Sequence, residues 1–157
     1  MIRRLASVSG TVVLMFAVSL LAIFGRYVII DPATAMTIGA LVLASLLSII
    51  GSTSDSVAFG PLTVPWNVLV GTANIVISVT VVLSTIRAAV VTGDVASWLV
   101  AAAMLTVGVA VSWQGGQIAR NSRHLDLDET PSSRRFVAGT LLLAGTFGFG
   151  VLAGTVV

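Results

Sequence analysis

The chain has 157 residues, of which 57% are hydrophobic and only 9% charged, whereas soluble domains carry about 25% charged residues. This balance excludes an ordinary soluble domain and indicates an integral membrane protein. The formal net charge is +2, and all basic residues are arginines that flank apolar runs, a distribution that argues against nucleic-acid binding. Cysteine is absent, which excludes disulfides and thiolate metal sites.

Five apolar runs are long enough to cross a bilayer core of about 30 Å, which takes roughly 20 helical residues. In chain order they cover 8–30, 34–51, 66–86, 95–114 and 136–157. Each run must be helical, because hydrocarbon offers the backbone no hydrogen-bond partners. The predicted fold is therefore all-α: one membrane domain, 1–157, built as a bundle of five transmembrane helices.

The first run follows a basic start and so has to be compared with a signal peptide. No small-residue cleavage site opens into a polar region, and the apolar run resumes as "YVII" after Arg26. The adjacent Arg3 and Arg4 are a weak match to a twin-arginine signal. We interpret this run as a retained first helix with cytoplasmic anchoring charges.

Short segments with a capping residue or a proline indicate three helix starts. Asp31 is a typical N-cap residue, and Pro32 suits the first helical position because the N–H that proline lacks would have no partner there. The segments "TGD" at 92–94 and "TPS" at 130–132 have similar roles. The first two turns are short, which predicts that helices one and two, and helices three and four, form antiparallel pairs. In the longer connection, 51–65, Pro61 and Pro65 forbid a continuous helix. We expect an interfacial loop there; a re-entrant loop is the alternative, since "VAFGPLTV" is quite apolar.

Arginine counts predict the orientation of the chain. With a cytoplasmic N-terminus, six arginines are cytoplasmic and two are outside, as the positive-inside rule requires. The tryptophans Trp66, Trp98 and Trp113 fall at span ends, where an amphipathic ring prefers to lie. The predicted location is the plasma membrane, with the C-terminus outside.

The third run carries a stripe of polar and small residues along one side of the predicted helix. Three- and four-residue steps place the following residues together: Asn67, Gly71, Asn74, Ser78 and Thr85. Asn74 falls near mid-membrane, where an unpaired amide costs several kcal/mol, so the stripe must face protein or water. Three interpretations remain: structural contact with neighbouring helices, a hydrated pathway, and a site for a lipid or a partner's helix.

Small residues form stripes on two other predicted helices. Ala40, Ala44 and Ser48 lie on the second, and Thr146, Gly150 and Gly154 lie on the fifth. Such stripes let another backbone approach closely. We favour packing within the chain over dimerisation for both.

The polar segment 115–135 is predicted to be a cytoplasmic loop suited to a partner or to anionic lipid. His124, Asp126, Asp128 and Glu129 could contact a divalent ion, but the segment lacks the glycine and the spacing of an EF-hand loop. Flanking arginines favour a solvated, self-neutralising loop without a metal or cofactor.

No span contains a pair of acids, and intramembrane charge is nearly absent, so an intramembrane aspartyl hydrolase or an ion-coupled pump is not expected. The sequence predicts a non-enzymatic accessory or scaffold subunit acting through helix–helix packing. Its partners would be the lipid bilayer and either further copies of itself or a larger membrane complex. The alternative is a small-solute channel or transporter with a pathway along the third helix.

Overall fold

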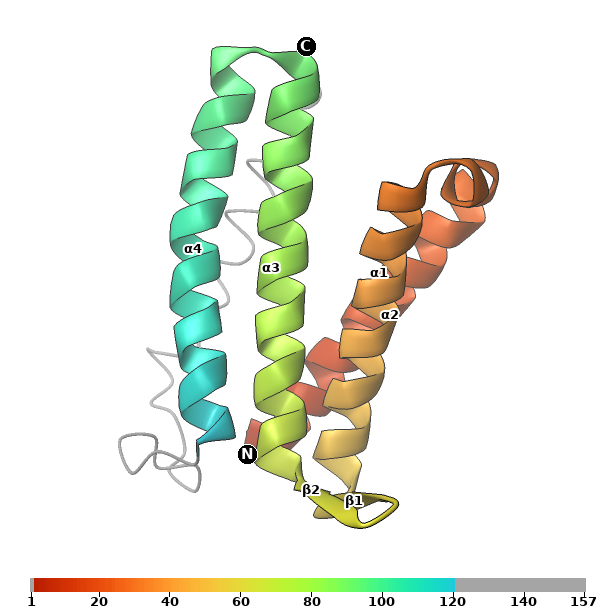
Figure 1. Ribbon diagram of the computed structural model, residues 1–157, viewed down its shortest axis with the longest axis vertical. Coiled ribbons are helices and arrows are strands. Elements are labelled where there is room, and N and C mark those ends of the chain that lie inside the picture. Colours follow the sequence, from red (N-terminus) through yellow and green to blue (C-terminus); the bar gives the residue numbers. More distant parts are fainter. Residues whose placement is uncertain (1, 121–157) are drawn as a thin grey trace.

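The computed structural model describes residues 2–120 and contains four long helices joined by two tight turns and a small β-hairpin (Figure 1). The helices are α1 (Ile2–Ile30), α2 (Pro32–Thr53), α3 (Trp66–Thr92) and α4 (Val95–Ala119). All four are long and apolar enough to span a membrane. The predicted fifth span, 136–157, lies outside the described residues, so the described bundle has four helices rather than five.

The predicted helix starts at 31 and 94 are confirmed. The Asp31 carboxylate accepts hydrogen bonds from the backbone amides of Ala33 and Thr34, and Pro32 occupies the first turn of α2. The Asp94 carboxylate accepts from the amide of Ser97 at the start of α4. Between them, Gly93 ends α3 with φ 70°, a left-handed conformation that glycine adopts without a steric penalty.

Five of the span boundaries lie further out than predicted, and the shift is largest at the start of α1 and at the ends of α3 and α4. Helix α3 continues to Thr92 rather than 86, which makes it 27 residues and about 40 Å long at 1.5 Å per residue. Helix α4 continues to Ala119, so residues 115–119 belong to a helix and not to the expected polar loop. Apolar length alone marks the hydrocarbon-crossing part of a helix, and capped helices extend beyond that part.

The connection expected to be a loop is an ordered two-stranded antiparallel sheet. Strand β1 (Ser56–Phe59) pairs with β2 (Leu62–Pro65), with Val57 opposite Val64. Gly60 takes φ 61°, as a two-residue hairpin turn with glycine first requires. Most of the strand residues are exposed, and the hairpin projects beyond the ends of α2 and α3 (Figure 1). The all-α description therefore holds for the bundle and not for this connection.

The helices form two antiparallel pairs, α1 with α2 and α3 with α4, joined through contact between α2 and α3 (Figure 1). The pairs meet closely at the hairpin end. There, Ala6 of α1, Val70 of α3 and Ile118 of α4 form one buried cluster, against which Trp66 packs. At the opposite end α2 and α3 diverge, so the bundle is V-shaped.

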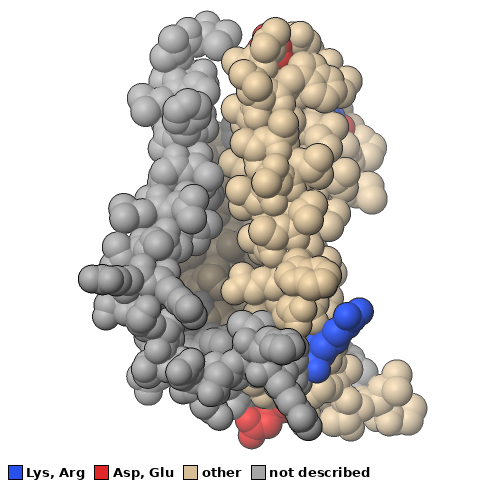
Figure 2. All heavy atoms as spheres, turned by 90° about the vertical axis from the view of Figure 1, so that its left-hand side faces the viewer, with Lys and Arg blue, Asp and Glu red and all other residues tan. Residues whose placement is uncertain are grey.

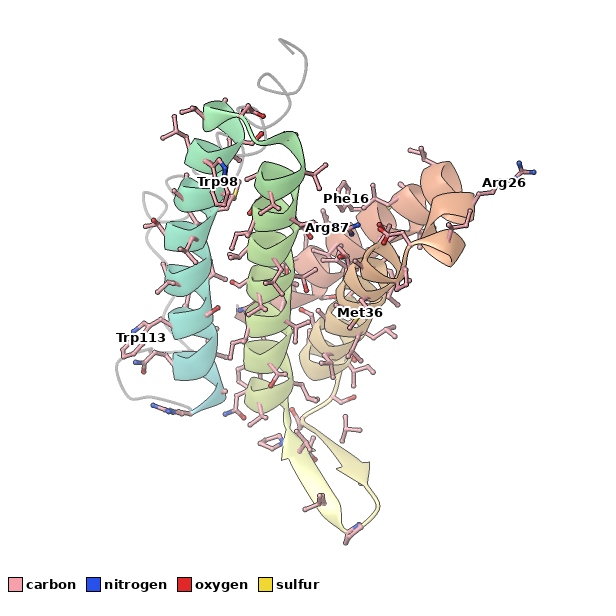
Figure 3. The ribbon with its side chains drawn as sticks, turned by 45° about the horizontal axis from the view of Figure 1, so that its top comes forward. Phe16, Arg26, Met36, Arg87, Trp98 and Trp113 are labelled. Atoms are coloured by element: carbon pink, nitrogen blue, oxygen red, sulfur yellow. The ribbon has the colours of Figure 1, made fainter. Side chains whose placement is uncertain are left out.

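The outward surface is apolar along the helices. Leu99 and Val109 on α4 are 67% and 62% exposed, and Val90, Val91 and Leu83 on α3 are similarly open. Figure 2 shows that the charged atoms of the described residues gather towards the two ends. Trp98 and Trp113 lie at opposite ends of α4 (Figure 3) and are 49% and 70% exposed, which fits the interfacial positions expected for them.

Candidate functional site

The polar stripe of α3 packs directly against α4. Gly71 is buried, and a Cβ added to it would lie 2.8 Å from the backbone nitrogen of Ala119. A Cβ added to Gly115 would lie 2.7 Å from the carbonyl oxygen of Gly71. The two backbones are therefore closer than any side chain at either position would allow, as in membrane-helix seams built on glycine.

Two side chains of the stripe bind backbone carbonyls of α4. The Asn67 amide donates to the carbonyl oxygens of Ala119, at 2.9 Å, and Ile118, at 3.3 Å. These carbonyls lie in the last turn of α4, beyond the regular series of helical hydrogen bonds. The buried Ser78 hydroxyl donates to the carbonyl of Gly108 at 3.2 Å. The side chains of the stripe thus bind backbone carbonyls of α4 and not side chains of α4.

The contacts define one antiparallel register. Moving seven residues along α3, from Gly71 to Ser78, moves seven residues back along α4, from Gly115 to Gly108. A further seven residues back leads to Ala101, which is 3% exposed. This complementary stripe, Ala101, Gly108 and Gly115, was missed by the sequence reasoning, although its seven-residue repeat of small residues was the signal that could have shown it.

The other two stripe residues have different surroundings. The Thr85 hydroxyl donates to the carbonyl of Val82 in its own helix, 2.9 Å away. Asn74 is half-buried, and a Cβ added to Gly115 would lie 3.2 Å from its Cβ, which places it in the same seam. Within residues 2–120 the Asn74 amide makes no hydrogen bond, whereas Asn67 and Ser78 of the same stripe each donate to α4.

The second helix uses its small residues against α1. Ala44 is fully buried and Ser48 is 2% exposed. The Ser48 hydroxyl donates to the carbonyl of Ala6 at 2.8 Å, across 42 positions of sequence. A Cβ added to Gly10 would lie 3.0 Å from the Cβ of Ser48 and 3.1 Å from the carbonyl of Ser45. Gly10 and Ser45 thus belong to a second close seam, and neither was predicted.

Contact between α2 and α3 is close only at the hairpin end. A Cβ added to Gly51 would lie 2.9 Å from the Cβ of Leu69 and 3.1 Å from the carbonyl of Trp66. Towards the other end the two helices border an open groove of about 920 Å³, within the range of small-molecule sites, about 300–1,000 Å³. Ala40, the third member of the predicted α2 stripe, lines this groove instead of contacting α1 tightly.

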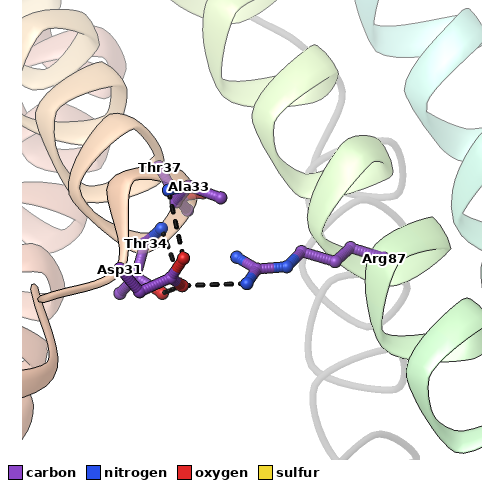
Figure 4. A network of polar contacts seen from close by, with 5 residues as sticks. All are labelled: Asp31, Ala33, Thr34, Thr37 and Arg87. Atoms are coloured by element: carbon purple, nitrogen blue, oxygen red, sulfur yellow. Dashed lines mark hydrogen bonds and ion pairs between the residues drawn. The ribbon is translucent and has the colours of Figure 1, made fainter.

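The groove is apolar over most of its length and polar at its outer mouth. Leu20 of α1, Met36 of α2, and Val79 and Leu83 of α3 are among its apolar walls. At the mouth, Arg87 Nη2 donates to Asp31 Oδ2 at 2.9 Å (Figure 4). This ion pair links the two helix pairs across the open end, and its side chains are half- and one-third exposed.

The carboxylate of Asp31 gathers four hydrogen bonds. The Thr34 hydroxyl and the amides of Ala33 and Thr34 donate to it, as does Arg87 (Figure 4). The Thr34 hydroxyl, followed by Arg87, lowers the pKa of Asp31 from its ordinary 3.8 to about 2. The pKa of Asp94 is lowered to about 2 chiefly by the Ser97 amide and hydroxyl. Both carboxylates are therefore charged at every physiological pH.

Other predicted site residues fall elsewhere. The small-residue stripe Thr146, Gly150 and Gly154 and the acidic segment around His124 lie outside the described residues. Within residues 2–120, carboxylate, imidazole and thiolate side chains form no group of three that could hold a metal ion.

Four long apolar helices, paired through glycine and serine seams, define a class: helical bundles with the dimensions of membrane spans. Within this class, the chain belongs to the family described as "Family of unknown function (DUF7994)", whose profile matches residues 1–131 and so covers all four helices. No curated protein and no solved structure matches the chain.

Proposed function

We propose that the protein is a non-enzymatic scaffold or accessory subunit embedded in the plasma membrane, acting through helix–helix contacts. The observation that carries this proposal is the use of the α3 polar stripe. Asn67, Gly71 and Ser78 contact the backbone of α4, which supports a role in holding the two helices together. In a bilayer, such contacts supply the specificity that the hydrophobic effect cannot provide between helices.

The proposed partner surface is the outer face of α4. Its residues Leu99, Leu105 and Val109 are about half to two-thirds exposed, whereas the buried residues of α4 are Ala101, Gly108, Gly115 and Ile118. Homo-oligomers and a larger membrane complex are the assemblies that we propose.

We also propose that the N-terminus is cytoplasmic and the C-terminus is outside. The start of α1 and the end of α4 lie at the same end of the bundle, since Ala6 and Ile118 share one cluster. Arg120 therefore lies at the N-terminal end, and Arg87 lies near the other. This separation supports the charge asymmetry on which the orientation rests.

The test uses the absence of cysteine from the native chain. Val109→Cys places one thiol on the outer face of α4, and Ala73→Cys, at a fully buried position, is the matched control. Crosslinking with a bifunctional maleimide in native membranes, followed by native mass spectrometry, should give a higher-mass species from the first variant only. A protein that stays monomeric and captures no partner would contradict the scaffold proposal.

The rival function, a small-solute channel or transporter, draws on one observation: the half-buried Asn74 amide has no hydrogen bond within residues 2–120. If Asn74 lines a pathway, Asn74→Leu should abolish a flux measured in proteoliposomes while the melting temperature stays unchanged. A native protein that conducts no tested neutral solute would remove this rival. A loss of stability of about 1 kcal/mol without any transport defect would favour a purely structural amide.

A further inference from the structure

We propose that the groove between α2 and α3 binds one phospholipid molecule, with an acyl chain along its apolar walls and its phosphate on Arg87. This inference stands apart from the scaffold proposal, because it concerns the opposite side of α3 from the seam with α4. It accounts for two features that helix packing leaves unexplained: an open apolar groove, and a half-exposed arginine at its mouth.

The walls of the groove match a hydrocarbon chain. Met36 of α2 and Val79 and Leu83 of α3 line it and are 76%, 47% and 61% exposed. Two of the hydroxyl groups along it are satisfied within their own helices: Thr37 donates to the carbonyl of Ala33, and Ser84 donates to the carbonyl of Thr80. The walls therefore present mainly carbon, with no unpaired charge along the length of the groove.

The position of Arg87 matches a headgroup. Arg87 lies five residues before the end of α3, a helix about 10 Å longer than a bilayer core of about 30 Å. Trp98 lies near the same end of the bundle on α4, at the level where indole rings prefer the interface (Figure 3). The guanidinium thus reaches the depth of lipid phosphates while its stem follows the groove wall.

The chemistry of Arg87 leaves it able to bind phosphate. A guanidinium has five N–H donors in a fixed fork, and the bond to Asp31 uses one of them. The side chain is 50% exposed, so its other donors are accessible. The hydroxyl and amide donors of Thr34 and Ala33 hold the Asp31 carboxylate in place beside the arginine, so the other donors of the guanidinium stay directed away from it. Charge and shape together favour an anionic amphiphile over a second apolar helix.

The test is native mass spectrometry of the full-length protein in mild detergent, titrated with phosphatidylglycerol or with diacylglycerol of the same acyl chains. We expect one bound phosphatidylglycerol, and diacylglycerol bound at least about tenfold more weakly, a difference of about 1.4 kcal/mol. Arg87→Gln should weaken phosphatidylglycerol binding by a similar factor. Arg26→Gln is the matched control, because Arg26 lies near the same end and points away from the groove (Figure 3).

Arg87→Gln also removes the tie to Asp31, so a second variant keeps the ion pair. Ala40→Trp fills the groove wall on α2, and Ala102→Trp adds the same bulk to an exposed position on α4. Ala40→Trp should lose the lipid and Ala102→Trp should keep it. Equal binding of diacylglycerol, retention in both Arg87→Gln and Ala40→Trp, or a lipid-free dimer dissociated by Ala40→Trp would each overturn the proposal.

Discussion

Gly71 of α3 and Gly115 of α4 pack backbone against backbone, so that a Cβ on Gly115 would lie 2.7 Å from the carbonyl oxygen of Gly71. Neither atom belongs to the flexible end of a side chain. A substitution at Gly115 must therefore push the two helices apart, and the hydrogen bonds of Asn67 and Ser78 depend on that same spacing.

The first prediction compares two adjacent glycines. Gly115→Ala should lower the free energy of unfolding by about 1–3 kcal/mol, the usual cost of overpacking a close contact. Gly116→Ala should be neutral or stabilising by up to about 1 kcal/mol, since nothing lies within 4 Å of its added Cβ and alanine is the better helix former. Denaturant titration in detergent measures both. Equal effects of the two variants would show that the seam is not close-packed.

The second prediction concerns the hydroxyl and amide that bind α4. Ser78→Ala and Asn67→Leu should each cost about 0.6–1.7 kcal/mol, the range measured for hydrogen bonds between membrane helices. Ser84→Ala is the matched control, because its hydroxyl binds the carbonyl of Thr80 in the same helix. Melting curves that rank Ser84→Ala with Ser78→Ala would contradict the role given to the interhelical bond.

The third prediction concerns the seam between α1 and α2. Ser48→Ala removes the hydroxyl that donates from α2 to the carbonyl of Ala6 on α1, and should destabilise the protein by about 1 kcal/mol. Thr53→Val is the control, since its exposed hydroxyl binds carbonyls of its own helix. The two variants are compared by thermal unfolding. A stability loss confined to Thr53→Val would refute this assignment.

The fourth prediction concerns acid. The folded-state pKa of Asp31 is about 2, below its ordinary 3.8, so its charged form stabilises the folded protein above about pH 4. This contribution should be lost as the pH falls through about 2. The difference in unfolding midpoint between the native protein and Asp31→Asn should therefore be constant from pH 7 to 4 and shrink below pH 4.

Asp94 is the internal comparison for that measurement, because its pKa is also about 2 but its partners, chiefly Ser97, lie in its own helix turn. Asp94→Asn should show the same pH window. Only Asp31→Asn should also loosen the open end of the bundle, which hydrogen exchange in α2 would report. Equal exchange in the two variants would count against the ion pair as a tie between the helix pairs.

Much of the fold could be predicted because its signals are local. Apolar length located the four described spans, and Asp31-Pro32 and Asp94 marked helix starts whose capping bonds the structure contains. The prediction of a loop at 51–65 was wrong, because the structure has a hairpin there. Gly60-Pro61 between "SVAF" and "LTVP" is a two-residue turn signal, but prolines also end helices, and a loop fits that property equally well.

The site was less predictable, because a helical pattern identifies a face but not the partner of that face. The spacing of Asn67, Gly71 and Ser78 showed that they share a side, while their contact with Gly108 and Gly115 depends on how α4 folds back. The groove depends on the divergence of α2 from α3 beyond Gly51, which no local signal encodes. Ala40 and Ala44 thus belong to one sequence stripe but meet different surroundings.

The two tightest seams join helices that are consecutive in the chain, α1 with α2 and α3 with α4. The first seam needs no residue of α3 or α4, so it can form without the second helix pair, and each helix pair can assemble as a unit. The contact at Gly51, the cluster of Ala6, Val70 and Ile118, and the salt bridge from Arg87 to Asp31 form only once both units are present, so late assembly depends on few of the described residues.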